Sequence, residues 1–598
     1  MATDIHLQEK EIRLADLVVA RKLWPFIRPY AWMLILSTFL VTLVTCFELV
    51  MPIFIQKALD GFILPVGIEK GIQILGFNIA TFQTFCILFS LFIITSFAID
   101  FFQSLFMEYT GQKIILHLRC SLFTHMTFLP VAFYDKNSSG RMVSRVAGDI
   151  ENMNEMFTSI LIFIFKDLML MAGILVILYT INIRLGFYLS LLVPVIVISI
   201  AMFSKILRTV FRTLRQKIAE INHSFSEAIT GIKIIQTSSS QNKFMQGFKN
   251  LNSEHFMAAV FQIKIFSIFM PFIGFLGVLS TAIIIWGGSF GVVEKSLTLG
   301  ELVAFLTYMK LFFRPLRELS EKFNLLQNAL ASAERIVNVL NTDTATHGIC
   351  EKSSRIEKID HIAFDQVDFS YNQKTMVLKN IRFHLEKGES IGIVGQTGSG
   401  KSSMINLITG FYQPVNGNIF INHINSKSLN IEDIRAKTSL VMQDPVLFSG
   451  TIRENIAPSG TDMDNSRLEK ALYDGNCDFL FETFSGLDTM IKEGGRPLSS
   501  GQKQLVCIAR AFAFNPDLII FDEATSYMDS QSEQTVHEAM NRLMKGRLSI
   551  IIAHRLSTVK NCDTILLLRE GKIREQGSHR ELVQLKGEYY HLLKKERI

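Results

Sequence analysis

The sequence predicts a chain of two parts, a membrane α-helical domain with six long transmembrane helices and an α/β domain built around a phosphate-binding loop. Three observations lead to this prediction. Long apolar stretches recur through the first half, the pattern ends in a polar stretch near residue 345, and a G-x-x-x-x-G-K-S motif follows in the second half. We place the two domains at residues 1–345 and 346–598.

The composition combines features of membrane and soluble proteins. Of the 598 residues, 49% are hydrophobic, which is more than most soluble enzymes carry. The net charge of +6 is small for this length and no long basic run is present, so we expect no nucleic-acid partner. The seven cysteines are scattered and form no C-x-x-C pair, so we expect free thiols. Acidic residues before the first apolar stretch argue against a cleaved signal peptide.

Six apolar stretches have roughly the length that a membrane-crossing helix needs. They are Trp32–Ile55, Thr81–Met107, Met156–Ile181, Leu185–Phe203, Ile268–Phe290 and Leu299–Phe313. Basic residues such as Arg13, Arg21 and Arg208 gather before the first stretch and after the fourth, whereas the connections at 182–184 and 291–298 are short or poor in basic residues. Because the basic side faces the cytosol, we expect an integral protein of the cytoplasmic (inner) membrane with its α/β domain inside.

The two cytosolic connections, at about 108–155 and 204–264, keep the apolar spacing of helices for much of their length. We therefore expect the helices to continue well beyond the bilayer and to meet a soluble domain there. Turn-forming residues interrupt the pattern at 135–140 and 237–242. These two turns are the candidate docking points, and ordinary helix-connecting loops are the alternative.

The phosphate-binding loop is the strongest motif in the chain. It follows a strand-like run, precedes a helical run that begins at Ser403, and consists of Gly395, Gln396, Thr397, Gly398, Ser399, Gly400, Lys401 and Ser402. In such loops, backbone N–H groups surround the phosphate oxygens, the lysine contacts the terminal phosphates and the serine hydroxyl ligates Mg²⁺. The motif therefore predicts a nucleotide site with Mg²⁺.

An apolar run that ends in two carboxylates is the second element of this site. Residues 518–521 precede Asp522 and Glu523. With the phosphate-binding loop upstream, we expect Asp522 to hold Mg²⁺ through water and Glu523 to polarise the attacking water as general base. A strand that merely meets a turn would show the same pattern, but the upstream loop favours hydrolysis.

Further motifs resemble those of the ABC transporter ATPases and occur in the order in which that family carries them. The family's L-S-G-G-Q signature resembles the run Leu498-Ser499-Ser500-Gly501-Gln502. The resemblance implies that Tyr371 stacks on the adenine of ATP, that Gln443 joins Ser402 and Asp522 at Mg²⁺, and that His554 is the switch histidine. Residues 526–529 fall where the family has its D-loop.

The resemblance extends to the first half of the chain. The first coupling loop of ABC exporters resembles 133–135, 140–141, Arg145 and 149–151 of this chain. The sixth helix of ABC exporters and its exit resemble 313–318 through 331–336. Because ABC importers usually carry their membrane and ATPase domains on separate chains, this fusion favours export. The resemblance implies a type IV ABC exporter-like fold and ATP-driven export or flipping of hydrophobic or amphipathic compounds, either drugs or lipids.

Family members bind ATP between the phosphate-binding loop of one ATPase domain and the signature of another, so the resemblance implies a dimer. Ser500 replaces the usual glycine, and Tyr527-Met528 replaces the usual Ala-Leu of the D-loop. The motifs that would serve the chain's own nucleotide match the family fully, whereas these two departures lie in motifs that would contact the partner's nucleotide. This asymmetry favours a heterodimer with a second, related ABC half-transporter. A side chain at Ser500 is expected to crowd the γ-phosphate and to restrict backbone angles that glycine leaves open. A homodimer that tolerates the serine is the alternative.

The cargo is the least determined part of the prediction. The 49 phenylalanines fit either a hydrophobic cavity or simple packing against membrane lipids. Glu48 and Asp100 lie within apolar stretches, where carboxylates commonly face a cavity or a partner, so both are candidates for receiving cationic substrates. We expect a hydrophobic small molecule or a lipid as substrate. A peptide exporter and an ATP-gated channel of the same architecture are alternatives, whereas the six spans exclude a soluble ABC ATPase.

Overall fold

The structure is a computed structural model that describes residues 21–63, 72–74, 77–79, 81–156, 161–294, 296–344, 355–458, 463–522, 530–553 and 555–596. The chain divides into two compact units. Residues 1–127 and 138–342 form the helical unit, and residues 128–137 and 343–598 form the α/β unit. The short segment 128–137 therefore belongs with the α/β unit, although the helical unit precedes and follows it in the sequence.

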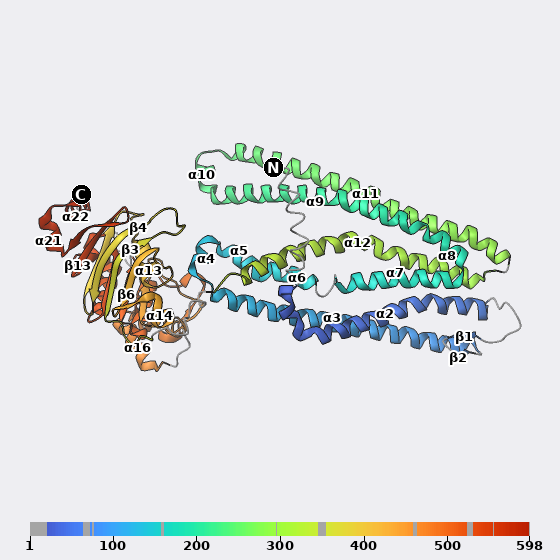
Figure 1. Cartoon of the computed structure of the whole chain (residues 1–598), viewed down its shortest axis with the longest axis horizontal. Coiled ribbons are helices and arrows are strands. Elements are labelled where there is room, and N and C mark those ends of the chain that lie inside the picture. Colours follow the sequence, from blue (N-terminus) through green and yellow to red (C-terminus); the bar gives the residue numbers. More distant parts are fainter. Residues whose placement is uncertain are drawn as a thin grey trace. The chain divides into compact units, whose positions relative to one another are not determined.

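The helical unit consists of long helices joined by short connections (Figure 1). Its elements are η1 (Arg28–Tyr30), α2 (Ala31–Ala58), η2 (Leu59–Ile63), β1 (Ile72–Ile74), β2 (Phe77–Ile79), α3 (Phe82–Thr127), α5 (Ser139–Ser144), η3 (Arg145–Asp149), α6 (Ile150–Glu155), α7 (Leu161–Ile181), α8 (Ile183–Ser190), α9 (Leu192–Thr230), α10 (Ile232–Thr237), α11 (Gln241–Val293) and α12 (Leu299–Leu340). At about 1.5 Å per residue, the 46 residues of α3 extend about 69 Å, more than twice the ~30 Å hydrocarbon core of a bilayer. The helices thus continue far beyond a membrane span, as expected.

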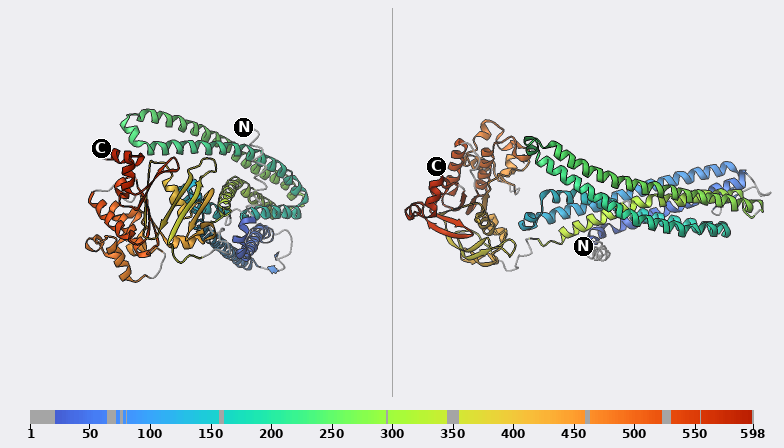
Figure 2. Two further views of the ribbon diagram at one scale, coloured as in Figure 1. Left: turned by 60° about the vertical axis from the view of Figure 1, so that its left-hand side comes forward. Right: turned by 90° about the horizontal axis from the view of Figure 1, so that it is seen from above.

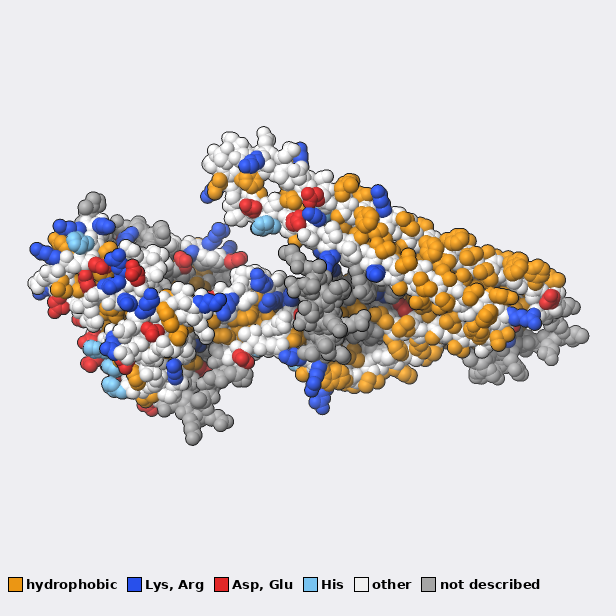
Figure 3. All heavy atoms as spheres, turned by 45° about the horizontal axis from the view of Figure 1, so that its top comes forward, with side chains coloured by type: hydrophobic (Ala, Val, Ile, Leu, Met, Phe, Trp, Pro, Cys, Tyr) orange, Lys and Arg blue, Asp and Glu red, His pale blue; other side chains and the backbone are white. Residues whose placement is uncertain are grey.

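Within the described residues, five helices are long and apolar enough to cross a membrane, judged by length and composition. They are Arg21–Ile63, Phe82–Thr127, Ile164–Ile181, Ile183–Thr230 and Gln241–Val293. The sixth expected span begins α12, which falls outside this set because Glu301, Lys310 and Arg314 interrupt its apolar part. In the view of Figure 3, hydrophobic side chains (orange) cover much of the surface of the helical unit, most densely in its right-hand part. The helical unit is therefore built to lie in a membrane.

The expected fourth span lies in one helical run, Ile183–Thr230, whose hydrogen-bond pattern is interrupted once, at Leu191. The helix α8 ends at Ser190 and α9 begins at Leu192. Pro194, in the first turn of α9, has no N–H group to donate to the carbonyl of Ser190. This missing hydrogen bond accounts for the interruption, and the backbone of Leu191 itself stays helical, with φ −65° and ψ −23°.

Buried apolar side chains from α2, α7, α8, α9, α11 and α12 form the core of the helical unit. The helices α9 and α11 lie side by side (Figures 1 and 2), and Phe203 stacks on Phe269 with ring centroids 3.6 Å apart. The buried hydroxyl of Tyr308 on α12 donates a 2.5 Å hydrogen bond to the carbonyl of Leu49 on α2. Because a buried hydroxyl is costly without a partner, this bond favours one register of α12 against α2.

The end of the first long helix also holds the beginning of α12. Asp60 in η2 accepts hydrogen bonds from the Thr298 hydroxyl at 2.7 Å and from the Gly300 amide at 2.8 Å. A carboxylate is favourable at this position because the N-terminus of a helix carries unpaired N–H groups and a partial positive charge.

The α/β unit contains a six-stranded sheet of order β14-β13-β5-β12-β11-β8 and a four-stranded antiparallel sheet of order β4-β3-β6-β7, and β9 pairs with β10. The strands are β3 (His361–Phe369), β4 (Leu378–Glu386), β5 (Ser390–Gly395), β6 (Asn416–Ile421), β7 (Ile424–Asn425), β8 (Thr438–Val441), β9 (Gly450–Thr451), β10 (Met490–Ile491), β11 (Leu518–Asp522), β12 (Leu548–Ala553), β13 (Thr564–Arg569) and β14 (Lys572–Gly577). The helices are α4 (Val131–Lys136), α13 (Lys401–Ile408), η6 (Ser426–Ser428), α14 (Ile431–Ala436), α15 (Ile452–Ile456), α16 (Asn465–Asp474), α17 (Phe479–Glu482), η7 (Gly486–Asp488), η8 (Glu493–Gly495), α18 (Ser500–Phe514), α19 (Ser530–Met544), α20 (Leu556–Val559), α21 (His579–Leu585) and α22 (Glu588–Glu596).

Two apolar cores cover the two faces of the six-stranded sheet. Successive residues of a strand point to opposite faces, and β11 follows this rule. Leu518 and Ile520 belong to the core shared with α13 and the four-stranded sheet, whereas Ile519 and Phe521 belong to the core shared with α18 and α19. Burial on both faces explains why β11 reads as a continuous apolar run.

Candidate functional site

The carboxyl ends of four neighbouring parallel strands gather the expected nucleotide-binding residues. In register, Val394 of β5 pairs with Ala553 of β12, and Phe521 of β11 pairs with Val441 of β8, while β11 and β12 are themselves parallel neighbours. The phosphate-binding loop follows β5, Asp522 ends β11 and Gln443 follows β8. Ligands commonly bind at the carboxyl ends of parallel strands. The sheet topology therefore brings these three groups to one edge.

The phosphate-binding loop has the backbone conformation that its glycines permit. Gly398 and Gly400 have φ angles of +82° and +107°, in the left-handed region that residues with a side chain rarely adopt. At Gly395 the constraint is space, because a Cβ atom there would lie 2.2 Å from the carbonyl oxygen of Leu568. The loop ends at the N-terminus of α13, where Gly400 provides no side-chain cap. Unpaired N–H groups at such a helix start form an anion-binding site.

Lys401 lies inside this loop, with only 6% of its surface exposed. Its ammonium group donates hydrogen bonds to the carbonyls of Gly395 at 2.8 Å and of Gln396 at 3.3 Å. Burial lowers the pKa of Lys401, and the carboxylate of Asp522 opposes that shift. Burial likewise raises the pKa of Asp522, and Lys401 opposes it. These two predicted site residues therefore lie close enough for each to stabilise the charge of the other.

The residues around Lys401 differ in access. Gln396, Thr397, Gly398 and Ser402 are exposed, whereas Ser399 and Ser403 are buried. The Ser403 hydroxyl is hydrogen-bonded to the hydroxyl of Tyr371 at 3.0 Å, a contact that sequence reasoning did not identify. The exposed Ser402 hydroxyl is thus available to a ligand, and Ser403 serves to position Tyr371.

Tyr371 is held by its neighbours and presents part of its ring to solvent. Asn406 of α13 donates to its hydroxyl at 3.1 Å, and its ring packs edge-on against Phe369 and Tyr412, with centroids 4.7 and 4.9 Å apart. The side chain is nevertheless exposed, at 41% of its surface. A fixed aromatic ring with an open face suits stacking on a nucleotide base, as base–aromatic stacking does in other sites.

The donor set expected for Mg²⁺ consists of oxygen groups, which this ion prefers. Ser402 offers a hydroxyl on the exposed side of α13, Asp522 a carboxylate beside Lys401, and Gln443 an exposed amide. Asp522 and Gln443 lie at the same edge of the sheet as the phosphate-binding loop, which itself carries Ser402. Glu523, His554 and the D-loop at 526–529 lie outside the described residues, so their predicted roles stay predictions.

The signature resemblance lies at the N-terminus of α18. Ser499 caps this helix: its hydroxyl accepts from the Gln502 amide at 3.3 Å, and its own amide donates to the Gln502 side chain at 3.0 Å. Among the described residues, no hydrogen bond or ion pair joins Ser499–Gln502 to the phosphate-binding loop. Gly501 is buried and Ser500 is exposed.

The structure corrects one part of the argument about Ser500. Ser500 is the first residue of α18 and does not have a positive φ angle. The position therefore does not need the conformational freedom of glycine, and the expected restriction of backbone angles was wrong. Only the bulk of the exposed hydroxymethyl group distinguishes Ser500 from the family's usual residue.

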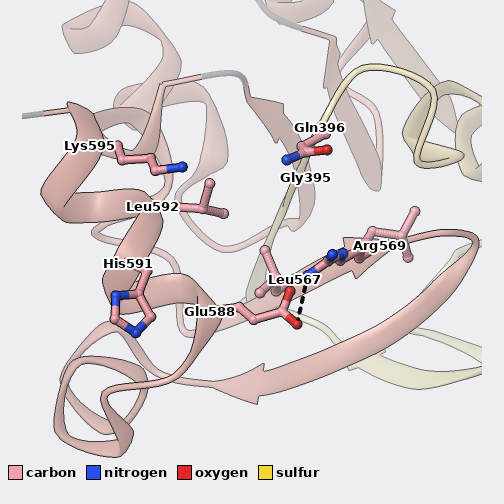
Figure 4. Close-up of a pocket in the computed structure, with 9 residues that line it drawn as sticks. Gly395, Gln396, Leu567, Arg569, Glu588, His591, Leu592 and Lys595 are labelled. Atoms are coloured by element: carbon pink, nitrogen blue, oxygen red, sulfur yellow. Dashed lines mark ion pairs between the residues drawn. The ribbon is translucent and has the colours of Figure 1, made fainter.

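A pocket of about 260 Å³ lies beside the start of the phosphate-binding loop (Figure 4). Gly395 and Gln396 form one wall, β13 contributes Arg569, and α22 contributes His591 and Lys595. Across the pocket Arg569 pairs with Glu588 at 3.0 Å. The pocket therefore adjoins the predicted nucleotide site through Gly395 and Gln396, whereas Tyr371, Lys401 and Asp522 are not among its lining residues.

The two carboxylates within the apolar stretches lie in different surroundings. Glu48 on α2 is paired with Lys166 on α7 at 2.9 Å, and Arg314 on α12 lies 3.6 Å from the same carboxylate oxygen. Glu48 therefore faces two cations, which disfavours its proposed role of receiving a cationic substrate. Asp100 is exposed on α3. The sequence showed the carboxylate of Glu48 but not the distant cations that neutralise it.

Comparison with known proteins identifies the family. The profile of the ABC transporter transmembrane region matches residues 34–316, and the profile described as ABC transporter matches residues 378–526. An uncharacterized ABC transporter ATP-binding protein of Bacillus subtilis (strain 168) is 33% identical over 581 residues, which cover 96% of this chain and 94% of that protein. An ATP-dependent lipid A-core flippase of Syntrophus aciditrophicus (strain SB) is 30% identical over 496 residues, which cover 82% of each chain.

A solved structure supports the same fold. The structure of a bacterial Atm1-family ABC exporter with ATP bound has a TM-score of 0.78 and 24% identity, and the match covers 95% of this chain and 100% of that one. The predicted fold class, a membrane α-helical domain followed by an α/β ATPase domain of type IV exporter-like architecture, is confirmed. The chain therefore belongs to the ABC transporter family, as an integral membrane half-transporter whose transmembrane region is fused to an ATP-binding transport ATPase.

Proposed function

We propose that this chain exports or flips hydrophobic or amphipathic compounds, either drugs or lipids, across the cytoplasmic membrane, and that it does so as one half of a dimeric ABC exporter. The observation that carries the proposal is the fusion of two features in one chain. Lys401 and Asp522 lie together at a glycine-rich phosphate-binding loop, and five long helices each contain an apolar window of membrane-crossing length with large hydrophobic side chains exposed. The flippase relative, which acts on lipid A-core by its name, supports a lipid-like cargo.

In the proposed reaction, the phosphates of ATP bind the N–H groups between Gly395 and Ser403, and Lys401 contacts the terminal phosphates. Tyr371 stacks on the adenine. Glu523 takes up a proton from the attacking water, and His554 orients the γ-phosphate or that water. The negative charge of the bound triphosphate favours the charged form of Lys401, which burial alone disfavours.

Mg²⁺ fits the same site. Ser402, Asp522 and Gln443 are the residues that would hold it, and their hydroxyl, carboxylate and amide oxygens match its preference for oxygen ligands. When bound, the ion neutralises charge on the phosphate oxygens.

We further propose that a second chain completes the site. Ser499, Ser500, Gly501 and Gln502 would contact the γ-phosphate bound to the partner, in line with the lack of a bond between this run and the chain's own loop. A heterodimer with a related half-transporter is favoured because Ser500 adds bulk to that contact, and a homodimer is the alternative. We place the domain boundary between residues 345 and 346, with the ATPase domain in the cytosol.

The test is substrate-stimulated ATP hydrolysis by the transporter in proteoliposomes, with a panel of lipophilic dyes, labelled lipids and hydrophilic solutes. The proposal predicts that lipophilic compounds stimulate hydrolysis and that ATP drives their movement. Stimulation by strongly hydrophilic solutes or peptides alone would contradict it. A current carried at bound but unhydrolysed ATP would instead identify a channel.

A further inference from the structure

Charged side chains from three long helices meet inside the helical unit. Lys166 on α7 pairs with Glu48 on α2 at 2.9 Å, and Arg314 on α12 lies 3.6 Å from the same Glu48 oxygen. Directly after Lys166, Asp167 pairs with Lys322 on α12 at 2.7 Å. The cluster thus holds three basic and two acidic groups, and its formal charge is positive.

This cluster lies at the ends of the apolar stretches: Glu48 is inside the stretch Trp32–Ile55, whereas Arg314 directly follows Leu299–Phe313 and Lys322 lies further along α12. Arg314 is about 22 Å along α12 from Leu299, and Glu48 is about 26 Å along α2 from Ala31, at about 1.5 Å per residue. Both distances are shorter than the ~30 Å thickness of a hydrocarbon core, whereas Lys322, about 34 Å along α12 from Leu299, lies beyond it. A charge at such a depth is costly unless it is paired or faces a water-filled cavity or a protein partner.

Arg314 is the cation in excess. The pair of Asp167 and Lys322 is close and mostly buried, and Lys166 already neutralises Glu48 at the shorter distance. Arg314 is farther from Glu48, and 51% of its side chain is exposed. It can therefore turn to another anion without leaving Glu48 unpaired. Because lipid is the least favourable environment for a half-exposed guanidinium, Arg314 faces either water or a partner.

The charges of the cluster favour an anionic ligand over a cationic one. A cationic ligand would meet Lys166 and Arg314 before the single carboxylate of Glu48, whose second oxygen is buried. An anionic group would meet a guanidinium, whose planar N–H groups bind a carboxylate or a phosphate in pairs. The aliphatic and aromatic side chains of the surrounding helices would receive an apolar body.

We propose that Arg314, with Lys166 beside it, binds the carboxylate or phosphate head of an anionic amphiphile. This inference rests on the proposed export function and narrows its substrate class from amphipathic compounds in general to anionic ones. In this assignment Glu48 holds the two cations in position and competes weakly with the substrate for Arg314.

Three probes with the same alkyl chain and different heads test this proposal: dodecyl phosphate, dodecyl maltoside and dodecyltrimethylammonium, each below its micellar concentration. The working transporter, with its partner chain where one is required, is reconstituted in nanodiscs. Binding is measured without ATP by quenching of intrinsic fluorescence, and ATP hydrolysis is measured separately. Dodecyl phosphate is expected to bind most tightly. The Arg314→Gln variant should raise its half-saturating concentration by about tenfold, the typical effect of losing a charge-assisted hydrogen bond, and should leave dodecyl maltoside unchanged.

Two further variants control for the loss of a positive charge and test the role of Glu48. Lys205→Gln removes a positive charge from the exposed surface of α9, away from the cluster, and should leave dodecyl phosphate binding unchanged. Glu48→Gln keeps the size of the side chain and removes the competing carboxylate, so it should strengthen dodecyl phosphate binding. If Glu48 instead received cations, this variant would weaken the binding of dodecyltrimethylammonium.

The outcomes separate this proposal from the proposed function. Tightest binding of dodecyltrimethylammonium, or unchanged dodecyl phosphate binding in a folded Arg314→Gln variant, would overturn the anionic site but leave the exporter intact. Binding of dodecyl phosphate that depends on Arg314, with no probe stimulating hydrolysis, would support the site and count against amphiphile export.

Discussion

Arg335 on α12 binds both carboxylate oxygens of Asp149. Its Nε donates to Oδ2 at 2.9 Å, a terminal guanidinium nitrogen donates to Oδ1, and the Ser332 hydroxyl also donates to Oδ1 at 3.0 Å. Asp149 is buried at the end of η3, shortly after the first predicted docking turn. This interaction joins the two segments of the first half that resemble ABC exporters, the coupling-loop region and the exit of the sixth helix.

Arg335→Lys should destabilise the helical unit. Lysine keeps the charge but cannot bind both oxygens of a carboxylate in parallel, so the buried Asp149 would lose hydrogen bonds worth about 1–3 kcal/mol. The expected result is a lower Tm of the purified transporter. Glu151→Gln is the matched control, because its 3.7 Å pair with Arg119 is solvent-exposed and should contribute less than about 1 kcal/mol. Equal Tm values for both variants would refute a structural role of the Arg335 interaction.

Tyr412→Phe should weaken the coupling between transport and hydrolysis. The Tyr412 hydroxyl donates a 2.6 Å hydrogen bond to Asp135, which lies in α4 within the 128–137 segment of the α/β unit. Burial, together with the bond to Asp135, raises the pKa of Tyr412, so the hydroxyl stays protonated at neutral pH. Loss of this bond should reduce substrate stimulation of hydrolysis by about fivefold to tenfold with ATP affinity unchanged. Tyr473→Phe, which removes an exposed hydroxyl on α16, is the control.

Part of this architecture could be predicted from the sequence because its signals are local. The phosphate-binding loop needs particular residues at consecutive positions, and the apolar stretches have the length that a bilayer imposes. The bond between Asp135 and Tyr412 could not be predicted, because 277 positions separate the two residues. Likewise, no local pattern near Glu48 indicates that Lys166, 118 positions away, neutralises its charge.

Other differences between expectation and structure arise where the sequence pattern is compatible with more than one backbone conformation. The apolar stretch Leu185–Phe203 lies in one helical run, but Pro194 interrupts its hydrogen-bond pattern between α8 and α9. At Ser500 the family pattern implied a need for glycine, whereas the position has ordinary helical geometry that serine adopts without strain. In both cases the hydropathy or the motif predicted the element correctly but did not determine the details of its backbone geometry.

Lys401→Ala should weaken the binding of ATP itself. The change removes the buried ammonium that the loop holds against the carbonyls of Gly395 and Gln396. We expect at least about a tenfold loss of affinity, since hydrogen bonds to charged groups contribute about 1.5–3 kcal/mol. Equilibrium titration with a fluorescent ATP analogue measures it. Lys427→Ala, an exposed lysine of the same unit, should bind normally, and unchanged affinity in Lys401→Ala would argue against the phosphate-loop assignment.

Ser500→Gly should speed hydrolysis at the site that this chain completes in its partner. Because Ser500 already has helical geometry, the gain would come from removing its hydroxymethyl group rather than from relaxing the backbone. The chain expressed alone is compared with the chain co-expressed with a related half-transporter, by mass in detergent and by ATPase rate. Activity that requires the second chain would support the heterodimer. A stable, substrate-stimulated homodimer with two equivalent hydrolysing sites would refute it.

The central claim is that hydrolysis of ATP at Glu523 drives the movement of an amphiphile, and Glu523→Gln tests it most directly. A positioned general base typically contributes 10² to 10⁴ to the rate, so we predict intact ATP binding and turnover reduced at least about a hundredfold. Transport of a labelled lipid or dye into proteoliposomes, measured alongside hydrolysis, should fall by the same factor. Near-normal hydrolysis in Glu523→Gln, or transport that continues without it, would contradict the account.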